Sequence, residues 1–211
     1  MTDYITEQEQ IELLKSWVKQ YSVVIFTGML LAFVVIFGWR TWQQRQYKIL
    51  SHASAIYDEM LTARAQHDPS ATLMQAQKLF SHYSSTTYGQ LAAFMLARDA
   101  AVKKNYTEAE KPLRWIIKQS GIASMRQIAR LRLARILIAE QKPEASIHLL
   151  KTVEDSTFNG LIHEIRGDAY LAMNNKSLAL DAYRQALTEL PNAEVIRPLL
   201  QMKYDDLVTA N

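Results

Sequence analysis

Cysteine is absent from the 211-residue chain, and glycine and proline are scarce, with six and five copies. Without cysteine the chain has no disulfide, no thiolate metal ligand and no cysteine nucleophile. The few glycines leave little room for a phosphate-binding loop, and no G-x-S-x-G, Walker or dinucleotide-binding pattern occurs. Alanine and leucine are abundant, and no stretch has the sustained two-residue alternation of a strand. We therefore predict an all-α fold.

Charge and histidine are not concentrated in any way that indicates a reactive site. The 24 Lys and Arg residues nearly balance 21 Asp and Glu residues, and the signs are mixed, which argues against nucleic acid as a partner. No histidine has another histidine three or four residues away, as a helical metal pair requires. His163-Glu164 begins a zinc-protease motif, but Gly167 occupies the place of the second histidine. The adjacent Asp205 and Asp206 are interpreted as a solvated helix end. We predict no enzymatic activity, no metal and no cofactor.

One long apolar run lies near the start of the chain, at residues 20–39. It has no charge between Lys19 and Arg40, and eleven of its residues are Val, Ile, Leu or Phe. A helix of about 20 residues is roughly 30 Å long, which matches the hydrocarbon core of a bilayer. The run is longer than the apolar region of a typical signal peptide, and no small-x-small cleavage site follows it. We predict a tail at 1–19 and a single transmembrane helix at 20–42; a buried core helix is the alternative.

Two features of this run bear on its surroundings. Gly28 and Ala32 form a small-xxx-small pair, which predicts the close approach of another helix; a lipid-facing surface is the alternative. The flanking positive charges favour the C-terminal side in the cytoplasm by one charge. These charges are Lys15 and Lys19 before the run, and Arg40, Arg45 and Lys48 after it.

The rest of the chain has the periodicity of helices separated by short breaks. Asp68 followed by Pro69 is typical of a helix N-cap and first helical position, and Thr107 with Glu110 has the spacing of a capping box. Pro112 falls inside one expected helix, where it should kink the helix or move its start. The expected helices are 43–66, 69–82, 88–103, 106–119, 123–140, 143–153, 158–173, 176–190 and 194–209.

Helix pairs of similar length indicate a repeat. The clearest copy matches the small, aromatic and closing-proline positions of a tetratricopeptide repeat with Gly167, Tyr170, Ala179, Tyr183, Ala186 and Pro191. Leu-Ala-Arg triplets at 96–98 and 133–135 indicate two weaker copies, in which Ala109 and Ala145 would be the small residues of the second helices. We predict a tetratricopeptide-like solenoid over 43–211, with repeats at 90–122, 127–158 and 160–193 and a capping helix at about 194–209.

In such a solenoid the first helix of each pair lines a concave surface. Its positions here combine apolar side chains with arginines and acids, and arginine can bind the carboxylates or carbonyl groups of an extended segment. We predict a protein-binding groove; core packing with surface ion pairs is the alternative. The groove residues are Leu91, Phe94 and Arg98, then Ile128, Leu131 and Arg135, then Leu161, Glu164 and Asp168.

Several short motifs occur in a specific order along nearly the whole chain. They are Gly38-Trp39-Arg40 with Trp42, Thr87-Tyr88-Gly89 with Leu91-Ala92, Leu131-Arg132-Leu133-Ala134-Arg135, Arg166-Gly167-Asp168-Ala169, and Gln201-Met202-Lys203. In these motifs and in its length the chain resembles the YfgM family, ancillary subunits of the SecYEG translocon in Gram-negative bacteria.

The resemblance implies a bacterial inner-membrane protein with a cytoplasmic N-terminus and a periplasmic repeat domain, and we follow it over the one-charge bias. It implies association with SecYEG and with a PpiD-like membrane chaperone, and help in handing newly translocated client proteins to periplasmic chaperones. It links residues 1–19 to a cytoplasmic stress-response regulator, and it implies no catalytic residue. An envelope assembly or signalling adaptor that binds a different membrane complex is the alternative.

Overall fold

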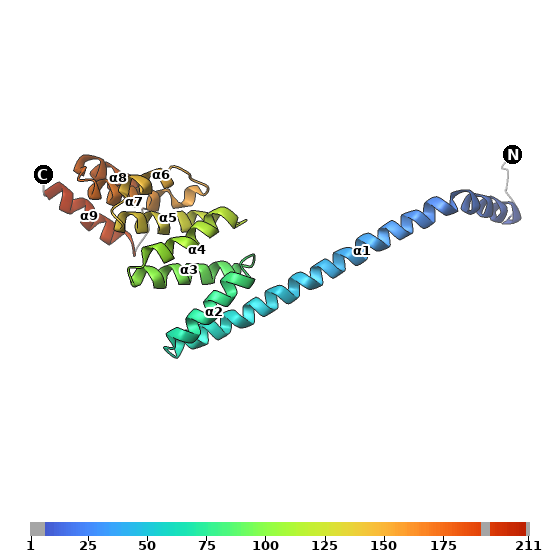
Figure 1. Ribbon diagram of the computed structural model, residues 1–211. Coiled ribbons are helices and arrows are strands. Elements are labelled where there is room, and N and C mark those ends of the chain that lie inside the picture. Colours follow the sequence, from blue (N-terminus) through green and yellow to red (C-terminus); the bar gives the residue numbers. More distant parts are fainter. Residues whose placement is uncertain (1–6, 191–194, 210–211) are drawn as a thin grey trace, which may run out of the picture. The chain divides into compact units, whose positions relative to one another are not determined.

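The computed structural model describes residues 7–190 and 195–209, apart from the side chains at 7–10, 13, 14 and 25. Within these residues the chain forms helices and no strand (Figure 1), which confirms the predicted all-α fold. The elements are α1 (Glu7–Ala65), α2 (Pro69–His82), α3 (Thr87–Val102), α4 (Tyr106–Gln119), α5 (Ala123–Ala139), α6 (Pro143–Leu149), the 3-10 turn η1 (Ser156–Phe158), α7 (Asn159–Ala172), α8 (Lys176–Glu189) and α9 (Arg197–Thr209).

The chain divides into two units, Met1–His52 and Ala53–Asn211. In the first unit α1 begins at Glu7, so the helix already includes most of the predicted tail, while residues 1–6 lie outside the described residues. The described large apolar side chains from Val23 to Phe37 are each between 60 and 78 % exposed. A Cβ atom added at Gly28 would meet no atom within 4 Å. This part of α1 therefore has an apolar surface that the unit itself does not cover.

Among the described residues, no single straight helix is both long enough and apolar enough to span a membrane. The two segments of α1 on either side of a 47° bend, Lys15–Val24 and Phe26–Ala65, have the required length and composition only together. The predicted single span at 20–42 therefore stays a prediction.

The second unit is built from helix pairs that share one type of turn. The last described turns of α1 pair with α2, α3 with α4, α5 with α6, and α7 with α8. Between the two helices of each pair lies a non-glycine residue in the left-handed region, with φ between 56° and 61°. The next residue donates its backbone N–H to the carbonyl five residues earlier, at 2.8–3.0 Å, which closes the first helix. The four left-handed residues are His67, Lys104, Gln141 and Asn174.

The residue after each left-handed position is the N-cap of the second helix. The Asp68 carboxylate accepts hydrogen bonds from Ser70 N and Ala71 N, both at 2.9 Å, which confirms the predicted cap. In the next pair the cap is Asn105, which accepts from Glu108 N at 3.3 Å, so the predicted capping box at Thr107 was wrong. Pro112 lies inside α4 and does not move its start.

The predicted helix bounds agree with the structure to within a few residues except at the start of α1, which is continuous from Glu7 instead of beginning at residue 43, and at the end of α6. The helix was expected to reach residue 153, but it ends at Leu149. The segment after it is held by other elements, because the Leu150 carbonyl accepts from Arg166 Nη2 at 2.9 Å and Glu154 N donates to a side chain on α5. The predicted small residue of this helix, Ala145, is exposed, so that prediction was wrong. The small buried residue is Ser146, which lies four residues after the N-cap, as Ala109 does in α4.

The core of the second unit consists of apolar clusters that each join consecutive helices. One cluster joins α1, α2 and α3, the next α3, α4 and α5, another α5 and α7 around the end of α6, and the last α8 and α9. Each helix therefore contacts its neighbours in the chain, as in a solenoid (Figure 1).

The closest approach in the third predicted repeat is made at Gly167. The ring of the fully buried Tyr183 on α8 lies against it, and a Cβ atom at residue 167 would overlap that ring. Ala179 and Ala186 are also fully buried, as a close crossing of α7 and α8 requires. The closing Pro191 of the predicted motif lies outside the described residues.

Candidate protein-binding surface

A continuous set of charged contacts crosses the first helices of the pairs and the last helix. We call it the charged row: Phe94 and Arg98 on α3, Arg132 and Arg135 on α5, Glu164 and Asp168 on α7, and Lys203 on α9. Each helix in the row contacts the next through these residues. It contains five of the nine predicted groove residues.

At the α3–α5 end of the row, arginine side chains lie beside an aromatic ring. The Arg132 guanidinium lies over the Phe94 ring, with its carbon 4.5 Å from the ring centroid. Phe94 is only 6 % exposed, so the ring is fixed by the core beneath it. Burial lowers the pKa of Arg132, and the nearby charges of Arg135 and Arg98 lower it further. Three positive charges are thus close enough to repel one another.

At the α7–α9 end the charges are paired within the chain. Glu164, which is 5 % exposed, accepts from Arg135 Nη2 at 2.9 Å and from Lys203 Nζ at 3.0 Å. Lys203 Nζ also donates to both oxygens of Asp168, at 2.8 and 2.9 Å, and the Tyr183 hydroxyl donates to Asp168 Oδ1 at 2.7 Å. The last helix is therefore tied to α7 by a shared, half-buried ammonium group.

The pKa values at this end follow from the same contacts. Burial lowers the pKa of Lys203, but hydrogen bonds and charge from Asp168 and Glu164 outweigh it, so the net shift is upward. Burial raises the pKa of Tyr183, and the hydrogen bond to Asp168 raises it further. The ammonium and the neutral phenol are thus fixed in their roles as donors, and neither group is activated for chemistry.

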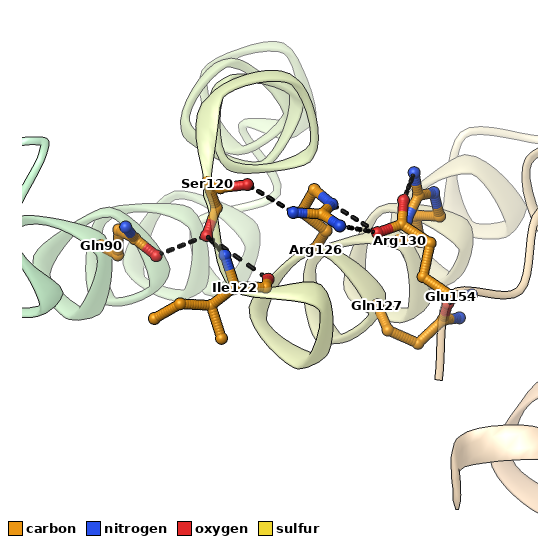
Figure 2. A network of polar contacts seen from close by, with 7 residues as sticks. All are labelled: Gln90, Ser120, Ile122, Arg126, Gln127, Arg130 and Glu154. Carbon is orange, nitrogen blue, oxygen red and sulfur yellow. Dashed lines mark hydrogen bonds and ion pairs between the residues drawn. The ribbon is translucent and has the colours of Figure 1, made fainter. Parts of the chain in front are cut away.

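A second polar network lies around the turn between α4 and α5 (Figure 2). The Ser120 hydroxyl donates to Gln90 Oε1 at 2.8 Å and accepts from Ile122 N at 3.2 Å. The Ser120 carbonyl accepts from Arg126 Nη1 at 2.6 Å. The buried pair of Gln90 and Ser120 therefore connects α3 to the start of α5.

The same network continues to Glu154, in the segment between α6 and η1 (Figure 2). Arg126 and Arg130 both form ion pairs with the Glu154 carboxylate, and Glu154 N donates to Gln127 Oε1 at 3.1 Å. The hydrogen bond from Arg126 lowers the pKa of Glu154, and Arg130 adds to this effect. The single carboxylate of Glu154 thus pairs with two arginines of α5. These contacts hold the irregular segment after α6 against α5.

A pocket of about 430 Å³ lies in the second unit where the end of α1, α2 and α3 meet. Arg98 of the charged row lines it together with Leu73 and Val102, which are 45 and 75 % exposed. Arg64 Nη2 lies 3.4 Å from Asp99 Oδ1 in its wall, while Arg64 Nη1 is buried without a hydrogen-bond partner. The α3–α5 end of the row therefore borders a pocket with both cationic and apolar walls.

Comparison with known proteins identifies the family. Residues 15–209 match the family model described as a tetratricopeptide repeat-like domain. The chain belongs to this tetratricopeptide repeat-like family.

Similar proteins match nearly the whole chain. Two proteins named "Ancillary SecYEG translocon subunit" are each 28 % identical to it. The match to the protein from Aggregatibacter actinomycetemcomitans covers 96 % of this chain and 98 % of that protein. The match to the protein from Neisseria gonorrhoeae covers 98 % of this chain and 100 % of that protein. The protein of the same name from Escherichia coli is 25 % identical, over 98 % of this chain and 99 % of its own. These matches confirm the resemblance to the YfgM family. No solved structure matches the chain.

The tetratricopeptide repeat-like fold distributes the nine predicted groove residues between core and surface. Phe94 and Leu131, 6 and 3 % exposed, belong to core clusters, and Leu91, Ile128 and Leu161 are half-buried. Arg98 and Arg135 are exposed, whereas Glu164 is buried and Asp168 half-buried, both in ion pairs. The arginines, rather than the apolar residues, therefore present most of the accessible surface of this set.

Two members of the charged row were not predicted, Arg132 and Lys203. Arg132 is four residues after Ile128 and three before Arg135, so helical spacing puts it on the same face and could have indicated it. Lys203 has no such signal, because it comes from another helix 35 residues after Asp168. Both residues occur in motifs of the YfgM resemblance.

The histidines and adjacent acids do not assemble in the described part of the chain into a group of three or more metal-ligating side chains. His163 Nε2 lies 3.7 Å from Glu189 Oε1 on α8. Burial lowers the pKa of His163; Arg166 lowers it further, while Glu189 opposes the shift. Asp205 accepts a hydrogen bond from Gln201 at 2.9 Å on the exposed side of α9.

Proposed function

We propose that this chain is a non-enzymatic subunit that associates with the SecYEG translocon. The observation that carries the proposal is the likeness to proteins named ancillary SecYEG translocon subunits, which covers 96–98 % of the chain in the three relatives above. A helical-repeat domain supports it, because stacked helix pairs offer long surfaces that bind other proteins by contact.

The predicted transmembrane helix at 20–42 is the membrane anchor in this proposal. The exposed apolar side chains from Val23 to Phe37 suit a lipid environment, in which a helix satisfies its own backbone groups. The tail at 1–19 lies in the cytoplasm, where it can contact a stress-response regulator, and the repeat domain lies in the periplasm of a Gram-negative cell. This orientation rests on the family resemblance. The residues that flank the helix favour the opposite orientation by one positive charge.

Two surfaces serve as contacts. Gly28 and the exposed Ala32 leave open space on one side of the anchor, which suits a helix of the translocon or of a PpiD-like membrane chaperone. The charged row and the half-buried groove residues around it form the surface in the repeat domain that meets partners or clients. Through this surface the protein helps to hand newly translocated proteins to periplasmic chaperones.

Affinity purification from the native host tests the association. The chain is tagged at its own locus, extracted in a mild detergent and compared with a tagged, unrelated single-span protein expressed at the same level. We expect SecYEG subunits and a PpiD-like chaperone to be enriched over the control. Their absence at native expression would contradict the proposal, and recovery of an envelope-assembly or signalling complex in their place would support an adaptor function instead.

The lack of cysteine makes the orientation directly testable. Single cysteines are introduced at Glu12 and at Gln185, both of which are exposed. A maleimide that crosses only the outer membrane should label Gln185→Cys in intact cells and Glu12→Cys only after lysis. The opposite labelling pattern would show that the flanking charges, rather than the resemblance, give the orientation.

A further inference from the structure

The α3–α5 end of the charged row contains more positive charge than the chain neutralises. Arg135 pairs with Glu164 at 2.9 Å, but Glu164 also holds Lys203 at 3.0 Å. Among residues 7–190 and 195–209, no ion pair engages Arg98 or Arg132. The acids of the row are therefore already shared at its other end, and two arginines are left without a carboxylate.

At this end the two unpaired arginines lie near each other, and Arg132 is positioned over an aromatic ring. Phe94 and Arg98 are four residues apart on α3, so they share one face, and the Arg132 guanidinium lies 4.5 Å from the centroid of the Phe94 ring. A guanidinium over an aromatic ring makes no hydrogen bond with that ring's face, so its N–H groups stay available for a planar acceptor, and the contact reduces the rotamer freedom that is lost on binding. Arg98 lies at the border of the 430 Å³ pocket.

Acids on the neighbouring elements do not supply that acceptor. On α3 itself, Asp99 lies 3.4 Å from Arg64 of α1, and the carboxylate of Asp68, just before α2, is occupied as the N-cap of that helix. On α7 the carboxylates of Glu164 and Asp168 are both engaged by Lys203. Repulsion from Arg98 and Arg135 contributes to the lowered pKa of Arg132, after burial, and a bound anion would relieve that repulsion.

We propose that Arg98 and Arg132 bind carboxylates of an extended acidic peptide segment from a partner or client protein. The guanidinium group of each residue can donate two parallel N–H hydrogen bonds to one carboxylate, a contact that adds both energy and geometric specificity. The inference rests on the proposed function, and it adds the chemistry of the bound segment: acidic, extended and held along the row from α3 to α5.

A binding experiment with peptides of opposite charge tests this assignment. The full chain in neutral detergent is titrated into a fluorescein-labelled peptide of alternating glutamate and serine, and into the corresponding lysine and serine peptide, with fluorescence anisotropy as the readout. We expect the glutamate peptide to bind and the lysine peptide not to bind. Added salt should weaken the complex, because exposed charges are screened.

Matched double variants assign the binding to the row. Arg98→Ala with Arg132→Ala should weaken glutamate-peptide binding by about tenfold or more, as the loss of charge-assisted hydrogen bonds predicts. Arg114→Ala with Arg184→Ala removes the same charge from exposed positions on α4 and α8 and should leave binding unchanged. Thermal melting of both variants shows that the fold is retained.

Three results would overturn the inference: no binding of the glutamate peptide, equal binding of the lysine peptide, or equal weakening by both double variants. Co-purification of SecYEG with the same variants separates this inference from the proposed function. If the translocon is recovered while the acidic peptide does not bind, the inference fails and the proposed function stands. If the peptide binds while the translocon is not recovered, the proposed function fails alone.

Discussion

Both ends of the charged row contain charged side chains, but only one end pairs all of them within the chain. At the α7–α9 end, Glu164 and Asp168 receive Arg135, Lys203 and the Tyr183 hydroxyl at 2.7–3.0 Å, so every charge has a partner within the chain. At the α3–α5 end, Arg132 has an aromatic ring as its neighbour but no carboxylate. Paired, half-buried charges stabilise a fold or fix its register, whereas preorganised charges without partners are available for recognition. In our proposal, therefore, the α7–α9 end contributes to stability and the α3–α5 end binds the acidic segment.

The largest expected effect comes from breaking the packing beneath the paired end. Gly167→Leu would force a side chain into the ring of Tyr183, which donates to Asp168. We expect it to lower the free energy of unfolding by about 2–4 kcal/mol through overpacking and lost contacts. Gly121→Leu is the control, because a Cβ atom at Gly121 meets nothing within 4 Å. Chemical denaturation of the full chain in detergent measures both, and unchanged stability of Gly167→Leu would contradict the repeat alignment.

Removing one charge from each end sharpens the comparison. Lys203→Met leaves Glu164, which is 5 % exposed, and Asp168 without their shared ammonium, and we expect a loss of about 1–3 kcal/mol of stability. Arg132→Met, at the other end, should change stability by no more than about 0.5 kcal/mol, because no ion pair is lost and the repulsion from Arg98 is removed. Denaturant midpoints of the two variants are compared. Equal losses would show that both ends are structural.

The repeated turn allows the same comparison at the level of the backbone. Lys104 in the turn after α3 and Asn174 in the turn after α7 have φ of 57° and 59°. A left-handed conformation costs a side chain such as lysine roughly 1–2 kcal/mol, glycine almost nothing, and asparagine less than most residues. Lys104→Gly should therefore stabilise the protein by about 1 kcal/mol, and Asn174→Gly by less. A thermal shift of equal size in both variants would contradict this account.

These turns also show what the sequence could and could not predict of the fold. Apolar periodicity and the cap at Asp68 placed the helices to within a few residues, and small residues such as Gly167 identified the closest crossing. The helix ends were not signalled by glycine, because His67, Lys104, Gln141 and Asn174 occupy the left-handed positions. Since the strongest local signal for a helix end is missing, the spacing between pairs was misaligned by one residue at Ala145, whose place is taken by Ser146.

The surface was predictable only where the helical register alone decides it. Arg98, Arg135, Glu164 and Asp168 follow from positions on the first helices, and all four lie in the row. Lys203 could not be placed, because nothing local in the sequence specifies which face of α7 the last helix meets. The network around Glu154 was missed for the same reason. Its partners Arg126 and Arg130 lie on α5, and Glu154 reaches them only because the chain leaves the helical path after α6.

The smallest expected effect is a dependence on pH at the paired end. Burial lowers the pKa of His163. The negative charge of Glu189 on α8 opposes this shift, and the positive charge of Arg166 on α7 adds to it. Because the unfolded chain then binds the proton more readily, stability from this residue is complete above the unfolded pKa of about 6.5 and is lost as the pH falls from that value through the lower pKa of the folded state. His163→Gln should therefore reduce the decline in stability from about pH 8 to about pH 5, whereas His148→Gln, at an exposed position on α6, should not. If wild-type protein gains stability on acidification relative to His163→Gln, the ion pair with Glu189 outweighs burial, and this end is held together by one more charge pair than the neutral histidine implies.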